Sequence, residues 1–266
     1  MGGLDTWGDL AGLAIAIGLS TIRLAAAFLV MPIFSNEVMP ALIRNSVFAI
    51  LGLVVAAAVQ PLDVLQAASP GRLLLIVAKE IFLGIAIGVL FGIFLWAFEA
   101  AGELIDTQTG MSQAQILDPF SGHEVTLISD FFGRFANLLF LSLGGLLLLT
   151  SVTLKSFAVW PLDTLLPRIE RDGVMLFADT FSGVFTLILL LAAPALAVVF
   201  LIDVGMGLLN RFAQRLNVFF LSNSIKSLVA VVMILLMLPL MIETLVRTLD
   251  ANAGETLDLV RSLFGG

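Results

Sequence analysis

The sequence predicts an all-α membrane protein, because long apolar segments recur along the chain while charged residues are scarce. Hydrophobic residues make up 60% of the 266 residues and charged residues only 12%. Soluble domains average roughly 45–50% apolar and about 25% charged residues. About 20 apolar residues in a helix cross the bilayer core, and we expect about six such helices, arranged in hairpins. They are Leu10–Ile33, Ala41–Val59, Leu73–Asp106, Leu127–Phe157, Ala178–Phe212 and Ile225–Leu249.

Three of these segments, the third to the fifth, are longer than a vertical crossing requires. Roughly 30 residues of helix extend about 45 Å, whereas the hydrocarbon core is about 30 Å thick. We therefore expect these helices to tilt, to kink or to project beyond the bilayer. The excess length suggests that the chain packs into a larger helical assembly.

Several classes of function are disfavoured by composition. The chain has no cysteine and one histidine, and its formal net charge of -7 provides no basic surface for nucleic acid. A zinc-binding HExxH motif starting at His123 would need a second histidine at position 127, which is Leu127. We expect no catalytic residue, no cofactor and no metal site. Asp5 and Asp9 near the start, without a basic residue, argue against a cleaved signal peptide.

The third segment contains three glycines at four-residue intervals, Gly84, Gly88 and Gly92. Residues at this spacing share one helix face, and glycines there permit close approach of another backbone. The pattern favours tight helix packing, within the chain or with a neighbour, over a substrate groove.

Charged residues inside apolar segments are costly and face partners or water. Arg23, Lys79, Glu80, Asp203 and Glu243 are such residues. Three interpretations remain open for them: ion pairing within the chain, a proton or ion pathway, and contacts with partner proteins.

A loop of about 20 residues separates the third and fourth segments, from Thr107 to Thr126. Glycine and the Asp-Pro pair are turn signals, and loops of this length are more often functional than simple connectors. Apolar and polar residues alternate in this loop. The alternation is consistent both with a constriction or lid and with an ordinary packed loop. The candidate residues are Gly110, Met111, Ser112, Gln113, Gln115, Ile116, Leu117, Asp118, Pro119 and Phe120.

The connection between the last two segments is basic. Arg211 and Arg215 are four residues apart and share a helical face, and Lys226 begins the next helix. Between them, Asn217, Ser222, Asn223 and Ser224 suit a turn. This connection is interpreted either as a hairpin turn that contacts lipid headgroups or as a docking element for a partner.

A set of short motifs occurs in order along the chain: Lys79–Ile81, Gly84, Gly88, Trp96–Gly102, Ile105–Gly110, Asp118-Pro119, Trp160-Pro161, Ala192–Pro194, Gly207–Ala213, Leu216–Phe219 and Lys226-Ser227. Taken together, these residues resemble the T subunit of the type III secretion export apparatus (the SctT, YscT and HrcT family), which is related to flagellar FliR. Asp106 and the Ile225–Ser227 run favour the virulence or symbiosis branch over the flagellar one.

The resemblance implies a non-enzymatic subunit of an export gate in the bacterial inner membrane, within the basal body of the secretion machine. It implies assembly with the R and S subunits (SctR and SctS), with the U subunit and with inner rod or needle proteins, in contact with membrane lipid. Residues 1–126 would resemble the R fold, and residues 127–266 would include a part resembling the S fold. The loop after the third helix would plug the pore through which unfolded proteins pass, and Lys79, Glu80, Arg211, Arg215, Asn217 and Lys226 are the expected partner contacts.

Three alternatives remain. The first is a flagellar FliR subunit, which would belong to the flagellar export gate and not to that of a virulence or symbiosis secretion system. A secondary transporter or ion channel is supported by Asp203 within the fifth segment, although no repeat of broken helices is evident. An intramembrane protease lacks a histidine partner or metal constellation.

Overall fold

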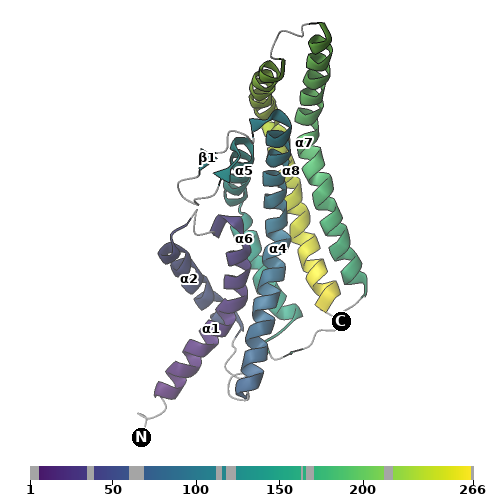
Figure 1. Ribbon diagram of the computed structural model, residues 1–266. Coiled ribbons are helices and arrows are strands. Elements are labelled where there is room, and N and C mark those ends of the chain that lie inside the picture. The colour runs from purple at the N-terminus through teal and green to yellow at the C-terminus, as the bar shows by residue number, and fades with distance from the viewer. Residues whose placement is uncertain are drawn as a thin grey trace. The chain divides into compact units, whose positions relative to one another are not determined.

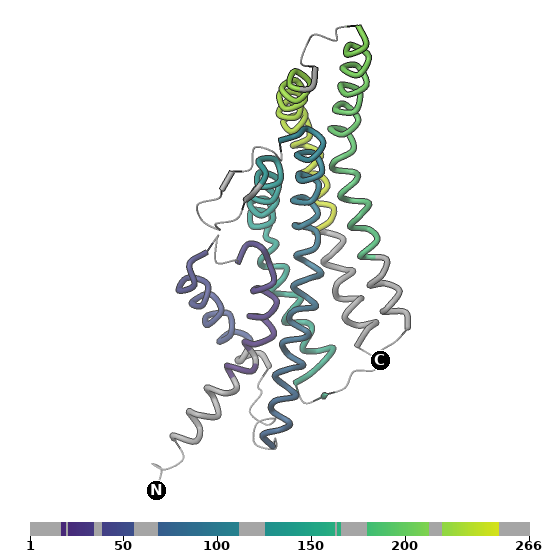
Figure 2. The backbone as a smooth tube through the Cα atoms, viewed as in Figure 1, coloured from purple at the N-terminus to yellow at the C-terminus, as the bar shows by residue number. Residues whose placement is uncertain are grey.

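A computed structural model defines the fold, and it consists almost entirely of helices (Figure 1). The structure describes residues 6–34, 39–59, 69–111, 116–117, 124–162, 164–165, 171–212 and 218–264, and Figure 2 traces their path. The helices are α1 (Thr6–Val30), the short 3-10 helix η1 (Pro32–Phe34), α2 (Ala41–Val59), α4 (Pro70–Thr109), α5 (Leu127–Ser142), α6 (Gly145–Val159), α7 (Arg171–Phe212) and α8 (Val218–Phe264). Two two-residue strands, β1 (Ile116–Leu117) and β2 (Glu124–Val125), pair antiparallel.

The predicted all-α membrane class is confirmed. Within the described ranges, three helical stretches are long and apolar enough to cross a membrane: Pro70–Thr109, Thr180–Phe212 and Phe220–Leu249. The bent pair α5 and α6 adds a fourth if it counts as one span. The apolar stretches Ile17–Val30 and Ala41–Val55 are shorter, so the expected six spans are only an approximate count.

The fourth predicted segment is broken into two helices. The sequence predicts one helix from Leu127 to Phe157, but α5 ends at Ser142 and α6 begins at Gly145. Gly144 between them has a φ of +82°, a left-handed conformation that glycine adopts without steric cost. The adjacent glycines therefore interrupt a segment that is apolar on both sides.

Several helices extend beyond their predicted limits. The α4 helix continues three residues past Asp106, and its 40 residues correspond to a length of roughly 60 Å. The α8 helix starts at Val218 and continues to Phe264, so the polar residues Ser222–Ser224, expected in a turn, are helical instead. Pro194 and Pro239 lie inside α7 and α8, and neither ends its helix.

The chain forms two compact units that alternate along the sequence. Unit 1 consists of Met1–Gly92, Gly144–Ala178 and Asp250–Gly266, and unit 2 consists of Ile93–Leu143 and Asp179–Leu249. These units are defined by packing. The expected resemblance of residues 1–126 and 127–266 to two other subunits is a separate matter, and it stays a prediction.

Unit 1 has an aromatic core where α1, η1 and α2 meet. Phe28 of α1 contacts Phe34 of η1 edge to face, with ring centroids 4.7 Å apart, and Phe48 of α2 lies 5.8 Å from Phe28. Edge-to-face aromatic pairs are a favourable packing arrangement. These contacts fix the hairpin that α1 and α2 form.

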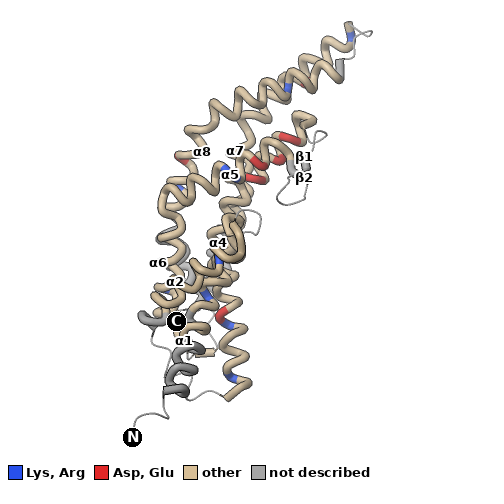
Figure 3. Tube along the Cα trace, turned by 90° about the vertical axis from the view of Figure 1, so that its left-hand side faces the viewer, with Lys and Arg blue, Asp and Glu red and all other residues tan. Residues whose placement is uncertain are grey.

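Unit 2 contains the second part of α4, α5, the β1–β2 pair and most of α7 and α8. Charged residues are sparse along these helices, but acidic residues gather at the end of α4 and the start of α5, near β1 and β2 (red in Figure 3). The polar contacts that organise the loop between α4 and α5 lie at these ends.

Candidate functional site

Two of the three predicted packing glycines lie against the backbone of α1. A Cβ added at Gly84 would meet the carbonyl oxygen of Arg23 and lie 2.6 Å from the Cβ of Ala26. At Gly88 it would meet the carbonyl oxygen of Ala27 and lie 3.0 Å from its Cα. Neither position has room for a side chain, so α1 and α4 approach within backbone contact there. Gly92 is also buried.

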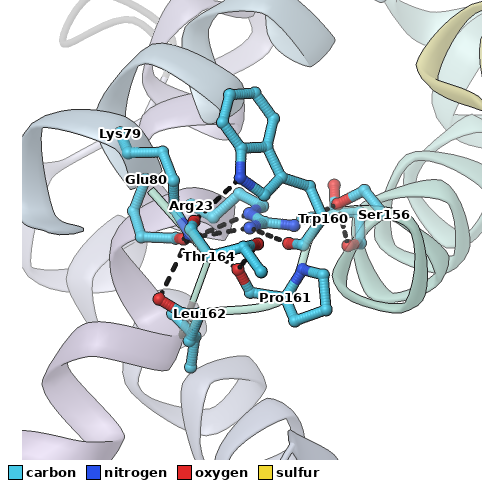
Figure 4. A network of polar contacts seen from close by, with 9 residues as sticks. Arg23, Lys79, Glu80, Ser156, Trp160, Pro161, Leu162 and Thr164 are labelled. Atoms are coloured by element: carbon cyan, nitrogen blue, oxygen red, sulfur yellow. Dashed lines mark hydrogen bonds and ion pairs between the residues drawn. The ribbon is translucent and has the colours of Figure 1, made fainter. Parts of the chain in front are cut away.

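The close approach brings together a buried ion pair, Arg23 of α1 and Glu80 of α4 (Figure 4). Arg23 Nε donates to Glu80 Oε2 at 2.6 Å and its Nη2 to Oε1 at 3.0 Å. Arg23 also donates to the hydroxyl of Ser156 and to the carbonyl of Trp160. The guanidinium thereby joins α1, α4 and the end of α6, with neither charged side chain exposed.

Lys79 completes this network from the neighbouring position on α4. Its ammonium lies 3.0 Å from Glu80 Oε1 and donates to three carbonyls of the segment that follows α6, those of Pro161, Leu162 and Thr164. An ammonium has three protons to donate, and a cation is favourable near the carbonyl end of a helix. Lys79 therefore fixes the course of the chain after α6.

A second polar cluster, in unit 2, holds the two ends of the predicted plug loop. Asp106 in the last turn of α4 accepts hydrogen bonds from the backbone amides of Ile128 (3.0 Å) and Ser129 (2.9 Å) in the first turn of α5. Thr126, the N-cap residue of α5, makes no capping hydrogen bond with its own side chain. Asp106 supplies the cap from another helix.

The start of α5 is packed on α4 as well as bonded to it. The hydroxyl of Ser129 donates to the carbonyl of Glu99 at 3.1 Å. A Cβ added at Gly102 would lie 2.6 Å from the Cα of Ser129. The helices before and after the loop are therefore joined at its base.

The beginning of the loop rests on α8. Gly110 has a φ of +77°, and a Cβ added there would lie 3.1 Å from Nδ2 of Asn223. Lys226 donates to the carbonyl of Gln108 at 3.1 Å and lies 3.0 Å from Oδ1 of Asp203 on α7. The end of α4 is therefore held by the α7–α8 hairpin.

Two short strands of the loop are paired. Ile116 is paired with Val125 and Leu117 with Glu124. Met111 is partly buried. The remaining predicted plug residues lie outside the part that the structure describes: Ser112, Gln113, Gln115, Asp118, Pro119 and Phe120. The plug assignment stays a prediction.

The expected partner contacts fall in different environments. Arg211 is exposed in the last turn of α7, whereas Arg215 and Asn217 lie outside the described residues. Lys79, Glu80 and Lys226 are buried and bonded to groups of this chain. The structure assigns these three residues intrachain contacts, and a contact with a partner subunit stays a prediction for them.

The sequence singles out Lys79, Glu80 and Arg23 as charges in apolar segments, with ion pairing as one interpretation, but it does not predict which of them pair or which other groups bind them. Arg23, the hydroxyl of Ser156 and the carbonyls around Pro161 complete the network. Arg23 was visible as a charge within an apolar segment, and a search for an opposite charge would have suggested Glu80. Asp106 is named in the sequence analysis for the family resemblance, and its contact with the start of α5 was not predicted. No three His, Cys, Asp or Glu side chains in the described ranges group closely enough to hold a metal ion.

The fold and these buried polar clusters define a membrane protein of long apolar helices. The sequence matches the family described as "Bacterial export proteins, family 1" over residues 14–251, and the chain belongs to this family. The predicted resemblance to the secretion T subunits and FliR is confirmed.

Three relatives show the breadth of the similarity. The "Yop proteins translocation protein T" of Yersinia pestis is 34% identical over 211 residues, 78% of this chain and 80% of the relative. The "Flagellar biosynthetic protein FliR" of Bacillus subtilis is 27% identical over 245 residues, 92% and 93% of the two chains. The "Surface presentation of antigens protein SpaR" of Salmonella typhimurium is 29% identical over 228 residues, 84% and 83%.

Proposed function

We propose that this chain is the T-type subunit of a type III secretion export gate in the bacterial inner membrane. Its role is structural: it lines part of the pore through which unfolded substrates leave the cytoplasm, and it catalyses no reaction. Membership of a bacterial export family and 34% identity to a translocation protein T support this assignment. Energy for transport comes from other parts of the machine.

The observation that carries the pore role is the double anchoring of the loop between α4 and α5. Asp106 holds the start of α5 against the end of α4, and Lys226 holds the end of α4 against α8. A plug must leave the pore when substrate arrives and return afterwards, so it needs a fixed base and a free middle. The anchored ends supply the base, and the apolar residues of the loop supply a surface that closes a pore by dewetting.

The partners in this proposal are the R and S subunits, with the U subunit and the inner rod or needle proteins beyond them. In the most apolar stretches of α7 and α8 only 28% and 33% of the residues are buried within the chain, against 56% in α4. The large apolar surface that α7 and α8 leave exposed suits contacts with neighbouring subunits and with lipid. The proposed division follows the resemblance, with residues 1–126 similar to the R fold and part of 127–266 similar to the S fold.

Two other functions are distinguished by their consequences. A flagellar export gate is supported by the FliR relative, which matches 92% of this chain, and it predicts rescue of motility in a strain lacking FliR. A secondary transporter or channel is supported by Asp203 inside the α7 span. It predicts solute or ion flux from the purified chain without partners.

The plug proposal is tested by removing residues Met111–Phe120 in cells that assemble the complete gate. We expect uptake of the membrane-impermeant dye propidium iodide to rise, at an unchanged amount of assembled complex, because the pore is then open when idle. A second variant keeps the length of the loop and replaces Ile116 and Leu117 by serine. It is expected to leak as well, because the closure depends on apolar surface. Unchanged dye uptake in both variants would contradict the plug.

A further inference from the structure

Asp203 is a charged residue within the apolar span of α7, and its side chain is 42% exposed. It lies at the edge of the exposed face of this helix. Phe200 and Gly207, three residues before it and four residues after it, are exposed. Val199 and Met206, four residues before it and three residues after it, are buried. Residues at these spacings lie on the same side of a helix, so the carboxylate emerges beside an uncovered apolar surface.

Two contacts within the chain meet one oxygen of this carboxylate. Oδ1 lies 3.0 Å from the ammonium of Lys226 and accepts a hydrogen bond from the hydroxyl of Ser222 at 3.4 Å. Oδ2 accepts no hydrogen bond from the residues that the structure describes. Lys226 also donates to the Gln108 carbonyl, at the negative end of α4, so two negative groups share one cation. The site therefore has room, in hydrogen bonds and in charge, for a second cation.

The length of the apolar span of α7 shows that lipid alone does not cover this region. The span has 33 residues, roughly 50 Å of helix, against a hydrocarbon core of about 30 Å. Covering all of it with lipid would need a tilt of roughly 50°, and transmembrane helices tilt by up to about 40°.

The hydrocarbon core therefore covers only part of the span, and it either includes Asp203 or ends before it. A core that includes Asp203 places an exposed charge in hydrocarbon, which is costly. A core that ends before Asp203 leaves the exposed side chains of Val204, Leu208 and Phe212 outside the hydrocarbon. A protein neighbour satisfies the surface in both placements, and lipid satisfies it in neither.

We infer that Asp203 binds a lysine or arginine of a partner subunit's transmembrane helix, which packs along the exposed face of α7 at Phe200 and Gly207. The inference rests on the proposed function, because it names the chemistry by which a partner in the gate recognises this helix. Gly207 lies one turn from Asp203, and a Cβ added there would meet no atom within 4 Å, so another backbone can approach closely. The partner's cation meets Oδ2, and Lys226 keeps its contact with Oδ1.

The first experiment identifies the neighbour by photo-crosslinking in cells that assemble the complete gate. Phe200 is replaced by the photoreactive analogue benzoylphenylalanine, and irradiation is expected to join it to a membrane helix of another subunit, within about one turn of a Lys or Arg. Leu201 is the matched control position, because both side chains are 68% exposed but position 201 is turned by roughly 160° from Asp203 around the helix. It is expected to give severalfold less of that peptide. No protein adduct at position 200, or equal yields of the same peptide from both positions, would overturn the inference.

The second experiment measures the amount of partner retained per chain after purification in mild detergent. Asp203→Ala is expected to lower this amount severalfold, because it removes the acceptor. Ser222→Ala, which removes a buried donor to Oδ1, is expected to retain the native amount. Unchanged retention by Asp203→Ala would overturn the inference.

A charge exchange separates recognition of the partner from folding of the chain. Asp203→Lys combined with Lys226→Asp keeps an ion pair within the chain but presents a cation to the partner. We expect this variant to lose the partner, and an acidic residue in place of the crosslinked partner's Lys or Arg to restore retention. Native retention by the exchanged chain alone, or no recovery with the altered partner, would overturn the inference, because the charge at position 203 would then serve only the fold.

The native chain, purified in parallel, distinguishes this inference from the proposed function. If the native chain retains its partners and the Asp203 variants retain them equally, only the inference fails. If the native chain retains no partner from its own membrane, the proposed function fails and the inference fails with it.

Discussion

Arg23 and Glu80 lie 57 residues apart in the sequence and form an ion pair 2.6 Å long in which neither side chain is exposed. Their pairing joins α1 to α4 at the level where Gly84 lets the two backbones meet. A buried charge that loses its partner is strongly destabilising. The pair therefore makes the packing of α1 on α4 specific to one register.

The ion pair predicts a large effect of neutralising Glu80. Glu80→Gln leaves the buried cations Arg23 and Lys79 without a counter-charge, and we expect a loss of roughly 3–5 kcal/mol in the free energy of unfolding. Glu243→Gln is a matched control, because Glu243 pairs with Arg247 on the surface, and surface pairs contribute about 0–1 kcal/mol. Denaturant unfolding of the purified chain in detergent measures both. Equal losses in the two variants would contradict a stabilising role of the buried pair.

Gly88 is predicted to tolerate no side chain. Gly88→Leu forces a branched side chain against the backbone at Ala27, and overpacking costs roughly 1–3 kcal/mol. We expect lower thermal stability, a lower yield of assembled complex and reduced secretion. Gly183→Leu is the control, since a Cβ there meets no atom of the chain within 4 Å. If Gly88→Leu unfolds at the same temperature as the native chain, the close approach of α1 and α4 is not required.

Asp106 is predicted to hold the first turn of α5. Asp106→Ala removes the acceptor for the Ile128 and Ser129 amides, and loss of a helix cap costs about 1 kcal/mol. Hydrogen exchange of these amides is expected to accelerate, and Asp106→Asn, which keeps an acceptor oxygen, is expected to recover part of the protection. Asp130→Ala, which removes a more exposed partner of Arg134 in the same helix, should have little effect. Unchanged exchange after Asp106→Ala would show that the cap is not needed.

How far the sequence reveals this structure depends on the kind of feature. The predicted limits of α2, about Ala41 to Val59, agree with the observed ones, because Pro40 precedes and Gln60-Pro61 follows a mostly apolar segment. The break at Gly144 is missed, because the leucine-rich segments on both sides continue the same apolar pattern. Composition over the whole chain is enough to predict the membrane class. The break between α5 and α6 depends instead on one residue, Gly144, with a positive φ.

The candidate sites show the same contrast. The glycine spacing predicts a close helix approach, but it does not identify α1 as the neighbour. The charged residues in apolar segments predict polar clusters, but tertiary packing decides that Arg23 meets Glu80 and that Lys226 meets both Asp203 and the Gln108 carbonyl. Contacts between distant segments leave no mark in the local periodicity of either segment.

The connection between α7 and α8 is predicted to contact a partner or the surrounding ring. Arg211 is exposed in the last turn of α7, and the double variant Arg211→Glu with Arg215→Glu reverses the charge there. We expect less co-purified partner at modest salt, with the difference shrinking as salt screens exposed charges. Arg247→Glu reverses the charge of an exposed residue within α8 and is the control. Intact assembly with an altered choice of secreted proteins would instead indicate that this connection contacts substrates.

The most direct test is gentle purification of the tagged native chain from its membrane, followed by identification of the proteins that remain bound. An export-gate subunit is expected to emerge in a large hetero-oligomer with two other small helical membrane proteins, the R and S subunits, because only about a third of the residues in the apolar α7 and α8 spans are buried within the chain. A stable, well-folded chain recovered alone under the mildest conditions, without those partners, would contradict the proposed function.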